Sequence, residues 1–175
     1  TTIKRNEDGS ITRVLPNLQS SADVYNSFLD LGFDGINPIG KNRAEMLYQG
    51  KYKRIIRKAI QERFPFLPAL RYDYPKVVKK FFSPEDNWEN VFPTIISNWD
   101  RTPRVGKNEG IYVNSTPQNF ENHIKDALKI VEDKQNEHKI IFLRSWNEWG
   151  EGNYVEPDIK YGHGYLDAIK KTIID

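Results

Sequence analysis

The sequence contains no cysteine, and this absence excludes several kinds of chemistry. Disulfide bonds, thiolate nucleophiles and cysteine-ligated metal sites are ruled out, but a secreted protein can also lack cysteine, so the compartment stays open. No apolar run approaches the roughly 20 residues that a membrane-spanning helix needs. An excess of one charge is also missing, because 26 basic and 24 acidic residues leave a net charge of +2. We therefore expect no transmembrane segment and no nucleic acid partner.

What the sequence does contain is typical of one soluble globular domain. Its 175 residues suffice for a proper core, and 38% of them are hydrophobic and 13% aromatic. We therefore treat residues 1–175 as a single domain. The first residue is Thr1 rather than methionine, so we expect the domain to be a trimmed or excised piece of a longer protein.

Helix caps and apolar spacing divide the chain into short elements. Ser20 or Ser21 can cap a helix that Gly32 ends, and Thr116 followed by Pro117 can start another. The spacing predicts helices over residues 20–31, 51–64, 76–82, 117–135 and 162–174, extended segments over 33–39, 69–72, 91–97 and 140–143, a loop with a short strand over 106–112, and an irregular segment over 1–19.

Apolar stripes indicate which helix faces are buried. We expect core positions in the 117–135 helix at Phe120, Ile124, Ala127, Leu128 and Val131, and in the last helix at Leu166, Ile169 and Ile173. The 51–64 helix has a stripe formed by Tyr52, Ile55, Ile56, Ala59 and Ile60, with Lys53, Arg54, Arg57, Lys58 and Arg63 off it. We interpret these charges as a solvated outer face rather than as a patch that binds a polyanion.

The alternation of strands and helices predicts an α/β fold. Such alternation builds a parallel sheet with right-handed crossovers. A closed eight-fold barrel typically takes about 250 residues, whereas this chain has room for three or four strand-helix units. Two architectures remain open, a small open-sheet domain and one half of a barrel.

The candidate site lies between Lys139 and Asp158. An apolar run from Ile140 to Leu143 predicts a buried parallel strand, and the segment from Trp146 to Gly152 then brings together carboxylates, indoles and glycines. Groups that perform chemistry in α/β proteins sit just past the carboxyl ends of such strands. We therefore expect this loop to be the functional site.

Glu148 and Glu151 are the candidate catalytic pair. If the loop turns helically, both carboxylates lie on one face with Cβ atoms about 5–6 Å apart. Retaining glycoside chemistry uses two carboxyl groups at roughly 5–5.5 Å, one donating a proton and one acting at the sugar. Trp146, Trp149 and Tyr154 interleave with these acids, and aromatic faces stack on sugar rings. Apolar walls beside a carboxyl would also favour a working general acid.

Structural roles compete with these functional ones. Trp146 can be a core residue, and Glu148 can pair with Arg144 or cap backbone amides. Asp100 can form an ordinary ion pair with Arg101 or Arg104, or it can contact a substrate, since it also follows a strand.

Two further groups of residues are assigned no catalytic role. The segment Glu156-Pro157-Asp158 is interpreted as a structural turn that orders the loop. His123, His138 and His163 have no partner at metal-ligand spacing, so we expect no metal and no cofactor.

Several motifs together resemble a known family, the WbsX-like glycosyltransferases of bacterial polysaccharide biosynthesis. These are similar to the endo-α-mannosidases and endo-α-mannanases of glycoside hydrolase family 99. The resemblance covers roughly Ser20 to Ile173 and rests on Trp146-Asn-Glu-Trp-Gly-Glu-Gly152, Glu156-Pro-Asp158, Tyr161-Gly162, Tyr165-Leu166, Asn98-Trp99-Asp100, Thr102-Pro103-Arg104, Ser115-Thr116-Pro117, Tyr72-Asp73-Tyr74 and Gly32-Phe33-Asp34. The chain departs from the family at Asp100-Arg101, where Asp-Asn is usual, and at Gly35-Ile-Asn-Pro38, where an aromatic-proline run is usual.

The resemblance implies a (β/α)8 TIM barrel of which this chain is the C-terminal half. It implies that Glu148 acts at the sugar and that Glu151 is the general acid/base. It further implies a carbohydrate-active protein of bacterial surface polysaccharide synthesis, such as lipopolysaccharide, O-antigen or capsule, with an oligosaccharide or activated sugar as substrate. The expected substrate contacts are Trp99, Asp100, Trp146, Asn147, Trp149 and Tyr154.

Alternatives to this function remain open. They are a non-catalytic sugar-binding or scaffolding module, an endo-acting α-glycoside hydrolase, and a binder of anionic ligands through the 51–64 helix. A half barrel would expose sheet edges, so we expect self-association or dependence on the missing N-terminal half. We also expect a cytoplasmic protein, with partners as the route to any membrane association.

Overall fold

The computed structural model describes residues 2–5, 7–8, 10–14, 21–64, 66–108 and 110–174, and these form a mixed α/β structure. The helices are α1 (Ser21–Asp30), α2 (Lys41–Gln49), α3 (Lys51–Arg63), α4 (Tyr74–Val77), α5 (Thr102–Val105), α6 (Pro117–Val131) and α7 (Gly164–Ile169). The strands are β1 (Thr2–Arg5), β2 (Ile11–Val14), β3 (Arg71–Asp73), β4 (Thr94–Ile96), β5 (Ile111–Val113), β6 (Phe142–Arg144), β7 (Asn147–Glu148) and β8 (Asn153–Tyr154). Short 3₁₀ segments are η1 (Val78–Lys80), η2 (Pro84–Asn87), η3 (Gly106–Asn108), η4 (Asn136–His138) and η5 (Trp149–Glu151), and a π-helical turn is η6 (Lys170–Ile174).

Three parallel segments in chain order form the sheet that carries the site. Ile36 forms a parallel bridge with Val91 just before β4, and β4 pairs in parallel with β6. The side-chain amide of Asn37 ties the first segment to β4, because its nitrogen donates to the carbonyl oxygen of Phe92 and to Oγ1 of Thr94, both at 2.8 Å. The carboxyl ends of the three segments therefore point the same way, as the α/β prediction requires.

A second parallel pair, β3 with β5, lies beside this sheet. The backbone nitrogen of Tyr112 in β5 donates to the carbonyl oxygen of Trp99 at 2.8 Å, which joins β5 to the segment that leaves β4. Tyr72, Tyr74 and Tyr112 are buried and meet edge to face with centroid distances of 5.9 and 6.3 Å. This aromatic cluster fixes the segment after β4, from which two site arginines extend.

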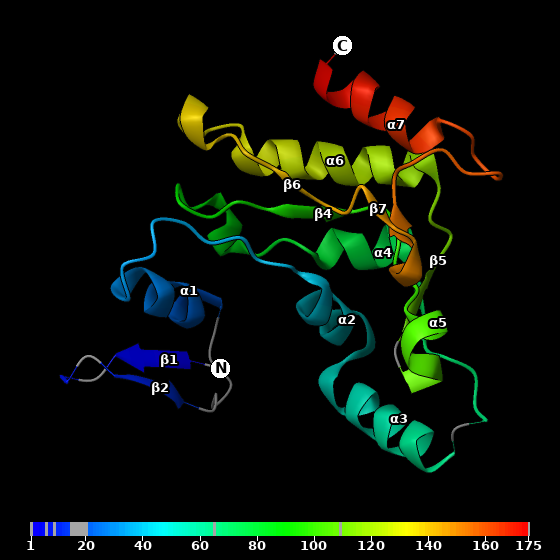
Figure 1. Cartoon of the computed structure of the whole chain (residues 1–175), viewed down its shortest axis with the longest axis horizontal. Coiled ribbons are helices and arrows are strands. Elements are labelled where there is room, and N and C mark those ends of the chain that lie inside the picture. Colours follow the sequence, from blue (N-terminus) through cyan, green and yellow to red (C-terminus); the bar gives the residue numbers. More distant parts are fainter. Residues whose placement is uncertain are drawn as a thin grey trace.

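Helix α6 covers the sheet, and α7 packs against α6 (Figure 1). The Thr116 hydroxyl accepts a hydrogen bond from the backbone nitrogen of Asn119 at 3.2 Å, which is the predicted N-cap, and Pro117 occupies the first turn. The predicted core positions of α6 are buried, apart from Leu128, which is partly buried. In the last helix Leu166 and Ile169 are partly buried, but Ile173 is 52% exposed, so its predicted burial is wrong.

Lys134, just after α6, anchors the loop that leads into β4. Lys134 is only 5% exposed. Its ammonium group donates to the carbonyl oxygen of Asp86 at 2.8 Å and also to that of Val91. The same loop starts with a capping box, in which the hydroxyl of Ser83 and its backbone nitrogen donate to the carboxylate of Asp86. A buried ammonium thus satisfies the carbonyl oxygen of Asp86 in η2 and that of Val91 in the loop before β4.

The apolar run before the site forms a strand with one buried face, not two. Ile141 and Leu143 pack on the core around α6, whereas Ile140 and Phe142 are 44% and 46% exposed. Within the described residues, β6 pairs only with β4 and the sheet does not close into a barrel. The predicted complete burial of residues 140–143 is therefore wrong, because no described element covers the outer face of β6.

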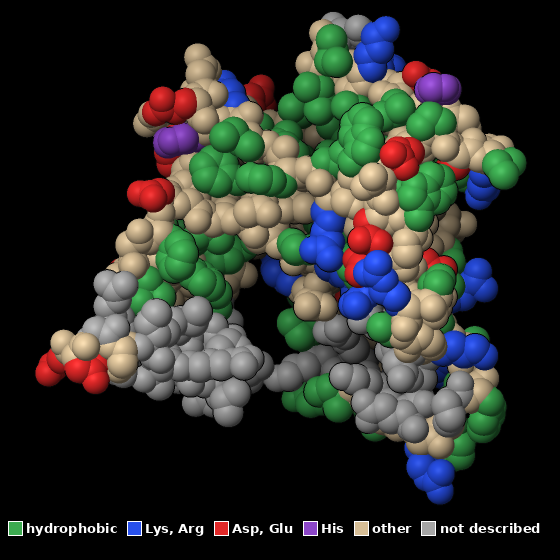
Figure 2. All heavy atoms as spheres, viewed as in Figure 1, with side chains coloured by type: hydrophobic (Ala, Val, Ile, Leu, Met, Phe, Trp, Pro, Cys, Tyr) green, Lys and Arg blue, Asp and Glu red, His purple; other side chains and the backbone are tan. Residues whose placement is uncertain are grey.

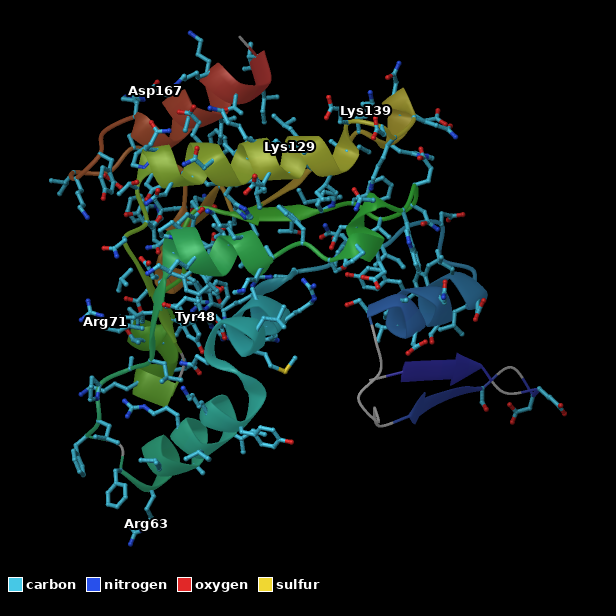
Figure 3. All side chains as sticks on the ribbon, turned by 180° about the vertical axis from the view of Figure 1, so that it is seen from behind. Tyr48, Arg63, Arg71, Lys129, Lys139 and Asp167 are labelled. Atoms are coloured by element: carbon cyan, nitrogen blue, oxygen red, sulfur yellow. The ribbon has the colours of Figure 1, made fainter. Side chains whose placement is uncertain are left out.

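The largest departure from the sequence interpretation concerns α3. Its predicted apolar stripe lies in solvent, with Tyr52 79%, Ile55 57%, Ile56 59% and Ile60 41% exposed. Figure 3 shows α3 extending beyond α2, with Arg63 at its far end. A solvated basic face was expected to imply a covered apolar one, but the apolar stripe is exposed, and on the basic side Lys53 and Arg63 are exposed while Arg57 donates to the carbonyl oxygen of Pro68.

Smaller departures concern the first half of the chain. Residues 1–19, predicted to be irregular, include the antiparallel hairpin β1–β2, while Thr1, Asn6, Gly9 and residues 15–20, with the cap candidate Ser20, lie outside the described residues. Helix α2 was not predicted, and residues 33–39 form only the bridge at Ile36. None of the described helices is long and apolar enough to cross a membrane.

Candidate active site

The site loop leaves β6 and folds back on itself as a small antiparallel pair. Residue Asn147 of β7 pairs with Tyr154 of β8, and Glu148 pairs with Asn153. Gly152 makes the return possible, because its φ of 60° lies in the left-handed region that glycine adopts without strain. A Cβ at this position would lie 3.0 Å from Cβ of Asp100. Gly152, between β7 and β8, thus permits both the turn and the close approach of the segment after β4.

Ser145 holds the base of this loop. Its backbone nitrogen donates to Oδ1 of Asn153 at 2.8 Å, and its hydroxyl donates to the carbonyl oxygen of the same residue at 2.8 Å. The backbone nitrogen of Glu148 donates to the Ser145 hydroxyl at 3.2 Å. These three hydrogen bonds fix where the first glutamate leaves the sheet.

Glu148 and Glu151 are brought together by arginine, and with Arg101, Arg104 and Arg144 they form what we term the Glu–Arg cluster. Arg104 bridges the two acids: its Nη2 lies 3.0 Å from Oε1 of Glu148, and its Nη1 lies 3.2 Å from Oε1 of Glu151. Nε of Arg101 lies 3.1 Å from the same Glu151 oxygen, and Nη2 of Arg144 lies 3.3 Å from Oε2. Figure 2 shows acidic and basic side chains gathered where β7 and α5 lie in Figure 1.

The two glutamates have different surroundings within the Glu–Arg cluster. The side chain of Glu151 is 9% exposed and meets three guanidinium groups, whereas that of Glu148 is 39% exposed and meets only one of them. Three positive charges face two negative ones, so the cluster carries one excess positive charge. The environment of Glu151 is therefore cationic rather than the apolar wall that the sequence suggested.

A cavity of ≈ 360 Å³ opens beside the Glu–Arg cluster, at the carboxyl end of the parallel sheet. It is lined by Asn37, Ile39, Thr94, Phe142, Leu143, Arg144, Ser145, Glu148, Glu151 and Asn153. The side-chain nitrogen of Asn153 is buried and has no hydrogen-bond partner among the described residues. The cavity thus combines two carboxylates, a guanidinium and amide and hydroxyl groups with the apolar side chains of Ile39, Phe142 and Leu143, a mixed lining that is typical of small-molecule sites.

The aromatic residues of the loop lie on its outer side. Trp149 and Tyr154 stack with centroids 3.6 Å apart and planes 15° apart, and Nε1 of Trp149 donates to Oε2 of Glu156 at 2.7 Å. Trp146 is 55% exposed, so it is not the core residue that one sequence interpretation allowed. Neither tryptophan lines the cavity, nor does the exposed Asn147. They form the surface next to it.

Trp99 lies in the core beneath the Glu–Arg cluster. It is 3% exposed, and three cations lie over its ring at centroid distances of 4.6 Å (Lys41), 5.3 Å (Arg144) and 5.9 Å (Arg101). A ring that attracts guanidinium groups to its face helps to hold two arginines in place. In the described structure Trp99 therefore supports the cluster and presents no open face for a sugar.

Asp100 organises backbone rather than pairing with an arginine. Its Oδ1 accepts hydrogen bonds from the backbone nitrogen and the hydroxyl of Thr102, at 2.9 and 2.6 Å, which starts α5. Its own backbone nitrogen donates to the carbonyl oxygen of Glu151 at 2.7 Å. The arginines that follow it contact the glutamates, so the structure gives no support to the ion pair that was one of the two roles considered for Asp100.

The segment Glu156–Asp158 orders the loop, in agreement with the sequence interpretation. Oδ1 of Asp158 accepts from the backbone nitrogen of Tyr161 at 2.5 Å, and Oδ2 accepts from the hydroxyl of Tyr154 at 3.2 Å. Partial burial, followed by the charge of Asp158, raises the pKa of Tyr154 above its usual value. The phenol is therefore a hydrogen-bond donor at neutral pH and belongs to the scaffold.

The histidines lie apart from the site. His123 is fully buried on α6, His138 pairs with Glu89 at 2.6 Å, and His163 is exposed before α7. Across the residues that the structure describes, no three histidine, aspartate or glutamate side chains come together as a metal-ligand set.

The sequence placed the two glutamates in one loop and suggested Arg144 as a partner of Glu148, but in the structure Arg144 pairs with Glu151 and Glu148 pairs with Arg104. The three arginines, Ser145 and Asn153 carry most of the contacts around the glutamates. Arg101 and Arg104 follow β4, whose carboxyl end neighbours that of β6, so strand order could have indicated them. No local pattern identifies Asn153.

Comparison with known proteins places these motifs in a family. The family model described as glycosyltransferase WbsX matches residues 8–169. Two curated relatives, both described as "Uncharacterized protein WxcX" and from two strains of Xanthomonas campestris pv. campestris, are 27% identical over 84 residues. The match covers 47% of this chain and 12% of each relative, so the chain aligns with only a small part of them. No solved structure gives a significant match.

Proposed function

The chain belongs to the glycosyltransferase WbsX family, and from this membership we propose that it is a carbohydrate-active domain in which Glu148 and Glu151 act on a sugar substrate. The observation that carries the proposal is the pair of carboxylates, linked by one guanidinium, on the wall of a cavity of mixed polar and apolar lining at the carboxyl end of parallel strands. Glycoside chemistry requires two carboxyl groups that flank one sugar carbon.

In this proposal the two glutamates have separate tasks. Glu151 donates a proton to the departing oxygen and accepts one from the incoming hydroxyl, and Glu148 assists at the anomeric centre. Because Glu151 is held by three guanidinium groups, a substrate must displace at least one of them before the carboxyl group can donate. Arg144, which lines the cavity and whose side chain is 37% exposed, is the partner that a sugar in the cavity meets, while Arg104 holds the two acids together from outside the lining.

Neighbouring polar groups support recognition of a sugar. Asn153 lines the cavity, and its fully buried side-chain nitrogen has no partner among the described residues; such a donor costs about 1–3 kcal/mol, which a ligand hydroxyl that displaces the groups covering it would recover. The exposed Trp146 and the outer face of the Trp149–Tyr154 stack supply aromatic surface for sugar residues beyond the cavity. Asp100 and Trp99 act through the loop and the arginines that they position.

We further propose that the chain is an arc of a (β/α)8 barrel whose remaining strands lie in another part of a longer protein. Three parallel segments in chain order, with α6 as the crossover between β4 and β6, support this architecture. The exposed Phe142 on β6 and Ile140 just before this strand fit a sheet that continues. The missing strands, or a second copy of the chain, would cover this edge. We also propose, from the motif resemblance to enzymes of polysaccharide biosynthesis, that the substrate is a bacterial surface polysaccharide or its activated sugar precursor.

A second function is favoured by one specific observation. Both glutamates are already paired with arginine, and a structural ion-pair network also brings carboxylates together. A sugar-binding module that has lost its chemistry would keep the aromatic surface and the cavity. This candidate predicts that oligosaccharide binding is unchanged when both glutamates are replaced by glutamine.

The experiment that tests the proposal is an activity assay of the full-length protein on a panel of nucleotide sugars and polysaccharides. Glu151→Gln and Glu148→Gln are compared with Glu132→Gln, an exposed position on the far end of α6 that leaves the site intact. General acid-base catalysis typically contributes 10²–10⁴-fold, so we expect losses of about that size in the first two variants and none in the third. Unchanged turnover in both site variants would refute the assignment.

A further inference from the structure

Helix α3 presents an apolar face to solvent that the sugar site does not use. We term the side chains of Tyr52, Ile55, Ile56 and Ile60 the α3 apolar face; they recur at helical spacing and are 41–79% exposed. The chain continues from this helix into Phe64 and Phe66, which are 43% and 73% exposed and meet edge to face at 5.8 Å. Contiguous apolar surface of this kind marks an interaction site.

The helix is held on its other side, which fixes the direction of the α3 apolar face. Nη2 of Arg57 donates to the carbonyl oxygen of Pro68 at 3.3 Å, and α3 contacts α2 and η3. Nothing in the part of the chain that the structure describes covers the α3 apolar face. Figure 3 shows the helix at the periphery, away from α6 and α7, where Lys129 and Asp167 are labelled.

Positive charge is concentrated on the same helix. Within α3 the sequence has six basic residues and one acidic residue, Glu62, a net charge of +5. The whole chain carries +2, so the remaining residues carry −3. Lys53 and Arg63 are exposed, and the guanidinium group of Arg63 lies 5.7 Å from the ring centre of Phe64. Exposed apolar residues, aromatic rings and basic groups thus share one 13-residue element.

We propose that α3 binds the surface of an anionic lipid bilayer and lies in the plane of the interface. A basic amphipathic helix with exposed isoleucine and aromatic residues has the composition of such interfacial helices, in which the apolar side enters the acyl boundary and the basic groups meet anionic headgroups. At about 1.5 Å per residue the helix is roughly 20 Å long, too short to cross a bilayer of about 30 Å. It therefore lies on the membrane and does not span it.

Charge complementarity decides between this occupant and others. A second copy docked through the same face would bring together two helices that each carry a net charge of +5, and like charges near an interface are repulsive. A nucleic acid would use the basic groups but would leave the α3 apolar face uncovered, because contacts to phosphate need no apolar centre. An anionic bilayer offers acyl chains to the α3 apolar face and anionic headgroups to the basic residues of the helix.

The test is co-sedimentation of the chain with lipid vesicles. The chain is mixed with vesicles of phosphatidylcholine in which one lipid in three is phosphatidylglycerol, and with vesicles of phosphatidylcholine alone. We expect binding to the anionic vesicles, and we expect it to weaken as salt is raised from about 0.1 M to about 0.5 M. Added salt screens the charges, since the Debye length is about 10 Å at about 0.1 M and falls to about 3 Å at about 1 M. Absence of binding to anionic vesicles, or equal binding to both kinds, would overturn the proposal.

Matched variants distinguish binding through the α3 apolar face from nonspecific adsorption to vesicles. Ile56→Glu should reduce the partition coefficient about tenfold or more, and Lys53→Glu should reduce it about tenfold on anionic vesicles only. The controls are Ile159→Glu, at a fully exposed isoleucine in the site loop region, and Lys139→Glu, at an exposed lysine labelled in Figure 3 far from α3. Both controls should bind as the wild type does.

Light scattering without vesicles addresses the competing occupants. If the wild-type chain is a dimer that Ile56→Glu converts to a monomer, the face is a protein interface and the proposal fails. It also fails if duplex DNA binds the chain and removes it from anionic vesicles while Ile56→Glu leaves both interactions unchanged. These readouts do not depend on sugar turnover, so they are independent of the function proposed for the Glu–Arg cluster.

Discussion

His123 makes a sharp prediction about acid stability. It is fully buried on α6, stacks on Phe82 at 5.3 Å, and contacts Phe81 edge to face at 5.2 Å. Neither ring nitrogen has a hydrogen-bond partner among the described residues. Burial lowers the pKa of His123 from 6.5 to about 3, because the charged imidazolium cannot be solvated there.

The sign and size of the effect follow from linkage. The unfolded chain, with a histidine pKa of about 6.5, binds the proton that the folded chain rejects, so acid favours unfolding. The stability that depends on neutral His123 is present above about pH 6.5 and is lost as the pH falls towards 3. At pH 4, which is about 2.5 units below the histidine pKa of the unfolded chain, protonation of the unfolded state lowers the free energy of unfolding by about 3 kcal/mol.

The assay is urea unfolding of the wild type and of His123→Leu at pH 7 and pH 4. Other titrating groups affect both proteins equally, so the difference between their free energies of unfolding should change by about 3 kcal/mol in favour of the variant. His163→Leu, at an exposed histidine, should give no such change. If wild type and His123→Leu lost stability in parallel on acidification, the argument from burial would be refuted.

Two further predictions concern packing around the site. Lys134→Met should lower the free energy of unfolding by about 2–4 kcal/mol, because two buried carbonyl groups lose a charged donor. Lys129→Met, on the exposed side of α6, should change it by less than about 0.5 kcal/mol. Chemical denaturation measures both variants, and equal effects would contradict the anchoring role of Lys134. Gly152→Ala should cost more than Gly162→Ala, since both have positive φ and each alanine is strained by about 1–2 kcal/mol, but only at Gly152 does the new Cβ also lie within 3.0 Å of Asp100. Thermal unfolding compares the two, and equal losses would show that the loop tolerates the contact.

Local signals in the sequence identified most helix starts. The Thr116 cap with Pro117 begins α6 as predicted, with the Thr116 hydroxyl accepting from the backbone nitrogen of Asn119. These features depend on residues three positions apart, so they can be read without knowing the rest of the fold.

Burial could not be read in the same way. Residues 140–143 and the α3 apolar face look equally suited to a core, yet both leave apolar side chains exposed in the described structure. Apolar periodicity indicates which face of an element can be covered. It does not show which other element, or which other molecule, covers it.

The candidate site shows the same division between local and distant information. Glu148, Glu151, Trp149 and Tyr154 are near one another because a tight loop holds them, and their adjacency in sequence predicted this. The ion pair of Arg104 with Glu151 joins residues 47 positions apart, and only the neighbouring ends of β4 and β6 bring it about. The cationic surroundings of Glu151 were therefore not predictable from the loop alone.

The central claim is that Glu151 performs chemistry on a bound sugar. The most direct measurement compares oligosaccharide binding, by titration calorimetry, with turnover for Glu151→Gln in the full-length protein. We expect affinity within a few-fold of the wild type and turnover reduced by about 10²–10⁴-fold, because glutamine keeps the size and polarity of the side chain but cannot transfer the proton. Loss of binding and turnover together would make Glu151 a structural ion-pair residue, and retention of both would leave the cavity without its proposed acid.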